Sequence, residues 1–74
     1  MPSDEEKLRK LKSLLDYGIN HNEEHQEEMK EWAETAKKLD FPGAYDLLIS
    51  ASDELDQVTD YLRQALEELK ENGG

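Results

Sequence analysis

The sequence contains no cysteine, few basic residues and no long apolar run. Without cysteine, the 74-residue chain has no disulfide framework, no Cys-ligated zinc and no thiol nucleophile. Nine Lys and Arg stand against nineteen Asp and Glu, a net charge of −10, which argues against binding nucleic acid or anionic membranes. No apolar stretch reaches the ~18–20 residues that span a bilayer, and the N-terminus lacks the apolar core of a signal peptide. We therefore expect one soluble, cytoplasmic domain over residues 1–74.

Glycine and proline are also scarce, and their positions divide the chain. Pro42 and Gly43 lie in the one clear turn, and the segments on either side are rich in Leu, Glu, Lys, Ala and Gln. The sequence therefore predicts an all-α fold, with a helix over about 4–39, a turn over 40–43 and a helix over about 43–71.

Polar residues mark where both predicted helices begin. Ser3 and Glu6 have the spacing of a capping box, in which each side chain satisfies a free backbone N–H of the other residue. Asp40 fits an N-cap for the second helix, with Pro42 in its first turn.

Gly18 leaves two alternatives open for the first helix. Glycine destabilises a helix interior by about 1 kcal/mol, and Asn20 with Glu23 resembles a new N-terminal cap. The helix is then bent or broken near 18–20, which gives two or three helices in all. Alternatively, Gly18 is a small residue in one long helix.

Apolar residues recur at alternating spacings of three and four, which is typical of helices that pack as in a coiled coil. One short turn joins the two segments, so they form an antiparallel hairpin. In the expected pairing, Trp32 faces Ala51, His25 faces Val58 and Gly18 faces Ala65. The predicted packing positions are 8, 11, 15, 18, 22, 25, 29, 32, 36 and 39 in the first helix, and 44, 48, 51, 55, 58, 62, 65 and 69 in the second.

Further apolar residues lie beside these positions, and a lone hairpin leaves many of them in water. Two helices also provide a small core for a stable monomer. Either a third helix folds back, or two hairpins form a four-helix bundle. We favour the homodimer. The residues concerned are Leu14, Tyr17, Ile19, Tyr45, Leu47, Ile49, Tyr61 and Leu66.

Both histidines of the chain lie four residues apart in an acidic segment. Side chains at i and i+4 share one face of a helix, so His21 and His25 form a chelating pair suited to a divalent Ni, Co, Zn or Cu ion. The expected pairing also brings Glu28 near Glu54, and a cation relieves the repulsion between them. The candidate metal ligands are His21, His25, Glu28 and Glu54, with Glu24 in reserve.

Other interpretations of this segment need no metal. His25 and Asn22 are polar residues at packing positions, which fix helix register at a cost in stability, and His25 alone is a candidate pH switch. The pair is not the His-Glu-x-x-His motif of a protease, nor does it have the Glu-x-x-His spacing of di-iron proteins. With no nucleophile motif or phosphate loop, we expect no enzymatic activity.

The segment from His21 to His25, followed by Glu31-Trp32-Ala33, resembles a group of short acidic helical proteins of archaea and bacteria. These share an H-N-x-x-H signature followed by Trp-Ala. Some members occur beside, or fused to, His-rich parts of nickel or cobalt uptake systems, so the resemblance implies a role with these metals. The Gly-Gly tail and the Ser-Asp-Glu-Glu-Lys-Leu start are instead common in designed helical bundles, although a design for stability avoids Gly18 and His21.

Three functions follow as hypotheses. The first is an accessory protein that binds a transition metal, and the second is a helical oligomerisation or protein-docking module without ligand. The third is an acidic mimic that occupies a basic protein surface. Residues 16–60 hold thirteen acids and three bases, whereas the rest of the chain holds six of each. The excess negative charge therefore lies towards the turn of the hairpin, where it attracts cations.

Overall fold

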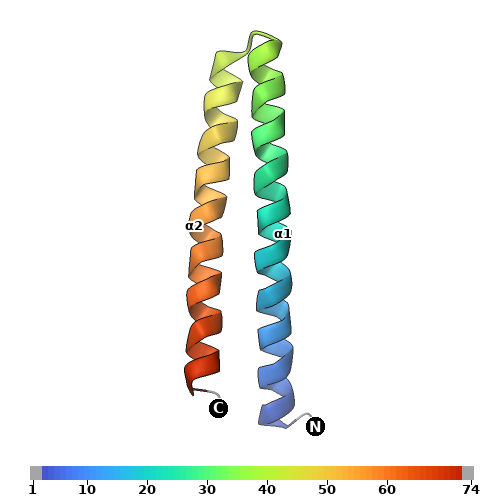
Figure 1. Cartoon of the computed structure of the whole chain (residues 1–74), viewed down its shortest axis with the longest axis vertical. Helices are drawn as coiled ribbons and strands as arrows, with labels where there is room; N and C mark the ends of the chain where they lie inside the picture. Colours follow the sequence, from blue (N-terminus) through green and yellow to red (C-terminus); the bar gives the residue numbers. More distant parts are fainter. Residues whose placement is uncertain (1–2, 73–74) are drawn as a thin grey trace.

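The chain forms two long antiparallel helices joined by a tight turn (Figure 1). The computed structural model describes residues 3–72, with α1 over Asp4–Lys38 and α2 over Pro42–Asn72. The Cα atoms span 54 × 20 × 14 Å, so the hairpin is a flat, elongated rod. This confirms the predicted all-α antiparallel hairpin. Neither helix, within the described residues, is long and apolar enough to cross a membrane.

The start of α1 confirms the Ser3 half of the predicted capping box. The Ser3 hydroxyl accepts a hydrogen bond from the backbone N–H of Glu6 at 3.2 Å, which satisfies one of the donors left free at a helix N-terminus. Asp4, Glu5 and Glu6 occupy the first turn, where negative charge interacts favourably with the helix dipole.

The turn differs from the prediction in the role of Asp40. Asp40 has a φ of 68°, and its N–H donates to the carbonyl of Lys37, while the N–H of Phe41 donates to the carbonyl of Ala36. These two bonds form a Schellman motif, which closes a helix C-terminus on a left-handed residue. Asp40 therefore ends α1, and the prediction that it caps α2 is wrong. Pro42 begins α2, where its missing N–H is not needed.

Helix α1 continues without interruption through Gly18, so the three-helix alternative is wrong for this chain. A Cβ atom at Gly18 would lie 3.5 Å from Cδ1 of Leu62, an ordinary van der Waals contact. Gly18 is thus a small residue where the helices meet. Its neighbour is Leu62 rather than the expected Ala65, which is exposed.

The stripe along which the helices pack differs from the predicted one at alternate positions. Positions 8, 15, 22, 29 and 36 of α1 and 48, 55, 62 and 69 of α2 lie inside as predicted. Between them, each inward residue follows the predicted one: Ala33 is buried while Trp32 is 64% exposed, and Thr59 is buried while Val58 is 47% exposed. We call the inward residues the buried stripe, although only Ile19, Ala33, Ser52, Thr59 and Leu66 are fully buried and the others are half-buried. The stripe consists of Leu8, Lys12, Leu15, Ile19, Asn22, Gln26, Met29, Ala33 and Ala36 of α1, and Tyr45, Leu48, Ser52, Leu55, Thr59, Leu62, Leu66 and Leu69 of α2.

Small side chains account for this shift. Ala33, Ser52 and Thr59 have 0%, 1% and 1% of their surface exposed, and side chains of this size let two helix backbones approach closely. A Trp at the same level would hold the helices apart. The hairpin therefore closes on its small residues and leaves larger apolar side chains outside.

Candidate functional site

The two histidines lie one helical turn apart near the middle of α1 and meet at their ring tips. Nε2 of His21 and Nε2 of His25 are 3.0 Å apart. The ring centroids are 4.4 Å apart, and the ring planes are perpendicular. The structure therefore brings together the two imidazoles that the sequence predicted to converge.

This separation suits two states of the pair. In the absence of a metal, one ring carries its proton on Nε2 and donates it to the other. A metal that replaces this proton forms two bonds of ~2.0–2.1 Å, which places the nitrogens about 2.9 Å apart at a 90° angle and about 3.3 Å apart at a tetrahedral angle. The observed 3.0 Å lies between these two values, so it suits chelation without selecting a coordination angle.

Two neighbours lie beside the rings from outside the pair. The Tyr17 ring stacks on the His21 ring, with centroids 5.5 Å apart and planes within 11°. A carboxylate oxygen of Glu28 lies 3.8 Å from Nδ1 of His25. At 3.8 Å this contact is too long for a hydrogen bond that would fix the ring. Glu28 therefore lies near the far nitrogen of His25 and does not share its Nε2 position.

Glu54, the fourth predicted ligand, does not join this cluster. Over residues 3–70, whose side chains the structure describes, no three His, Cys, Asp or Glu side chains gather into a group that could hold a metal ion. The shift of the buried stripe explains this, because Glu28 and Glu54 each precede an inward residue and point outward instead of towards each other. A single hairpin offers two imidazole nitrogens and no third ligand among its described residues.

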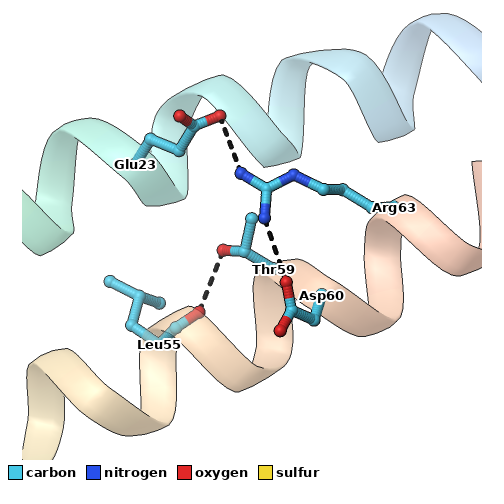
Figure 2. A network of polar contacts seen from close by, with 5 residues as sticks. All are labelled: Glu23, Leu55, Thr59, Asp60 and Arg63. Atoms are coloured by element: carbon cyan, nitrogen blue, oxygen red, sulfur yellow. Dashed lines mark hydrogen bonds and ion pairs between the residues drawn. The ribbon is translucent and has the colours of Figure 1, made fainter.

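A polar network that was not predicted joins the two helices on the side of the hairpin away from the histidine pair (Figure 2). The Arg63 guanidinium lies 3.3 Å from a Glu23 carboxylate oxygen and 3.0 Å from one of Asp60. The Thr59 hydroxyl donates to the carbonyl of Leu55 at 2.9 Å. The i,i+3 spacing of Asp60 and Arg63 was the only sequence signal for it, because the partner on α1 depends on the register.

The histidine pair belongs to a largely apolar surface that we call the open face. Its residues share one feature: each directly precedes a residue of the buried stripe, a rotation of ~100° about the helix. Glu23 and Arg63 each follow a stripe residue and meet on one side, so residues that precede the stripe share the other side. The open face consists of the apolar and histidine side chains of that side, and Glu28 and Glu54 lie on the same side beside them. Its residues are Leu11, Leu14, His21, His25 and Trp32 of α1, and Leu47, Val58 and Tyr61 of α2.

The open face is exposed except at His25, which is half-buried. Leu14, Trp32 and Tyr61 each have 64–65% of their surface in water, and Leu47 has 74%. By contrast, the buried apolar residues are Ile19, Ala33 and Leu66. An exposed apolar surface of this extent on a small protein marks an interaction site.

Comparison with family models assigns most of the chain to one family. Residues 11–69, which include the histidine pair, Glu28, Glu54 and all of the open face, match a model described as "Domain of unknown function" (DUF8180). Comparison with curated proteins and with solved structures finds no match. The match covers well over half of the chain, and the protein belongs to the DUF8180 family.

Proposed function

We propose that the protein is a cytoplasmic, non-enzymatic accessory protein that binds a divalent transition metal through His21 and His25. The observation that carries this proposal is the 3.0 Å separation of their Nε2 atoms. The pair is already close to the spacing of a chelate, so binding requires little rearrangement, and a preorganised site gains affinity.

The ligand type narrows the choice of ion. Imidazole suits Ni²⁺, Co²⁺ and Zn²⁺, and the resemblance to proteins associated with nickel or cobalt uptake favours the first two. The acidic surroundings of the pair, with thirteen acids and three bases over residues 16–60, further attract a dication at low ionic strength.

Isothermal titration calorimetry with NiCl₂ tests the proposal. Wild-type protein is expected to bind nickel, and His21→Ala/His25→Ala to lose the binding heat. The matched control is His21→Ala/Asn20→His, which keeps two histidines but places them five residues apart, so that they no longer share a face. It is expected to bind at least tenfold more weakly than wild type. Equal heats from all three proteins would contradict the proposal.

The exposed open face supports a second candidate function, a helical oligomerisation or docking module that works as a homodimer without ligand. The chain exposes 5843 Å², whereas a folded monomer of 8.6 kDa exposes about 4,700 Å². The excess is similar to the ~800 Å² that one partner buries in a standard interface. Covering the open face would remove it.

The two candidates differ in what the histidines do. If the protein is only a helical module, His21→Ala/His25→Ala stays dimeric and keeps or gains thermal stability, because alanine is a better helix former than histidine. Sedimentation velocity and thermal unfolding without metal measure both properties. If nickel also raises the melting temperature of wild type but not of the double variant, the metal-binding function is supported instead.

A further inference from the structure

We infer that a second copy of the chain completes the metal site, so that His21 and His25 of two hairpins supply four imidazole nitrogens to one ion. The inference rests on the proposed metal binding and adds the partner and the arrangement. Each copy offers only two nitrogens, with no third ligand among residues 3–70, whereas transition metals in proteins take four to six ligands. One hairpin therefore supplies only half of a four-ligand metal site.

The open face supplies the surface through which the second copy would bind. The broad side of the hairpin measures 54 × 20 Å, which is larger than the ~800 Å² per partner of a standard interface. Leu14 and Trp32 lie on either side of the histidine pair along this surface, and each is about two-thirds exposed. Two open faces packed together would bury these side chains and enclose the histidines between them.

Charge selects how the two copies are oriented. Thirteen acids and three bases lie in the part of the hairpin near the turn, over residues 16–60. If both turns pointed the same way, these acidic parts would face each other along their whole length and repel. If the turns point to opposite ends, the acidic parts overlap only around the middle of the hairpin, and the rest of each lies against the neutral part of the other copy. The two-fold axis is therefore perpendicular to the helices.

This orientation also brings the histidines together. When two flat hairpins stack face to face with their turns at opposite ends, α1 lies on α1 and α2 on α2. In the other orientation α1 lies on α2, and the two histidine pairs are diagonal to each other. The charge argument and the incomplete metal site thus select the same two-fold axis independently.

The spacing along α1 is symmetric about the histidine pair. His21 and His25 lie two residues on either side of Glu23, and Leu14 and Trp32 lie nine residues on either side. In the antiparallel stack, His21 therefore lies opposite the partner's His25, and Leu14 opposite the partner's Trp32. An apolar pair thus lies above and below a polar centre, and both members of each pair are large exposed side chains that the contact would remove from water.

Cysteine crosslinking tests this arrangement, because the chain has no cysteine of its own. Leu14→Cys and Trp32→Cys, prepared separately and mixed, are expected to form a disulfide-linked dimer on mild oxidation. Either variant alone is not, since residues 14 and 32 are eighteen apart, or ~27 Å along a helix, and a disulfide needs Cα atoms within ~7 Å. Crosslinking in either single-variant solution, or none in the mixture, would overturn the proposed axis.

The nickel stoichiometry tests the four-imidazole site separately. Titration of wild type is expected to saturate at one ion per two chains, and saturating nickel to tighten dimerisation at least tenfold, since coupling between two binding events is reciprocal. One ion per chain with unchanged dimerisation overturns the shared site but leaves metal binding by the histidine pair intact. Absence of nickel binding overturns both.

Discussion

At the scale of single residues, Ser52 has the least favourable environment. Only 1% of its surface is exposed, and its hydroxyl has no hydrogen-bond partner. A buried hydroxyl without a partner costs about 1–3 kcal/mol, but its small volume lets the helices approach. Ser52 thus allows close packing of the helices, but it leaves a buried hydroxyl without a hydrogen bond.

Replacing that hydroxyl should stabilise the hairpin. We expect Ser52→Ala to raise the free energy of unfolding by about 1–2 kcal/mol, because it removes the buried hydroxyl and improves helix propensity. Urea unfolding followed by circular dichroism measures the change. Ser50→Ala is the control, since Ser50 is exposed and gains only the propensity term. A loss of stability in Ser52→Ala would show that the hydroxyl has a role in packing.

At the scale of helices, the sequence predicted those features that depend on residues close together in the chain. The Ser3 cap depends on residues three apart, and the meeting of His21 with His25 on residues four apart, so both followed from the sequence. Asp40 was misplaced because Asp suits both roles. Its side-chain oxygen can accept a hydrogen bond as an N-cap, and its short polar side chain also tolerates the left-handed backbone that ends a helix. In such a short turn, composition does not separate the two roles.

The choice of packing stripe could not be read from the sequence for a different reason. Two stripes with similar spacing are possible on each helix; they share every second position and differ by one residue at the positions between. Hydrophobicity favours the one that contains Trp32 and Val58, whereas close approach of the helices favours the one with Ala33 and Thr59. A sequence pattern reports hydrophobicity, whereas the packing of the two helices depends on how closely they can approach. The Glu23–Arg63 ion pair and the outward direction of Glu54 both follow from that choice.

At the scale of the whole molecule, a single hairpin leaves the apolar side chains of the open face in water. A two-helix protein with so few buried apolar residues needs additional burial to be stable. The open face provides it without any change of fold. Dimerisation and metal binding would then be connected, because both use the same surface of α1.

A single charge on the open face should therefore separate the copies. We expect Trp32→Glu to weaken dimerisation at least tenfold, because a carboxylate would have to be buried against Leu14 of the other copy. Since Trp32 is 64% exposed in one hairpin, the variant should keep its helical circular dichroism at high concentration. Gln57→Glu is the control: it adds the same charge at an exposed position of α2 that lies outside the open face. Sedimentation velocity over a concentration series compares the two variants. A Trp32→Glu protein as dimeric as the Gln57→Glu control would place the dimer interface somewhere other than the open face.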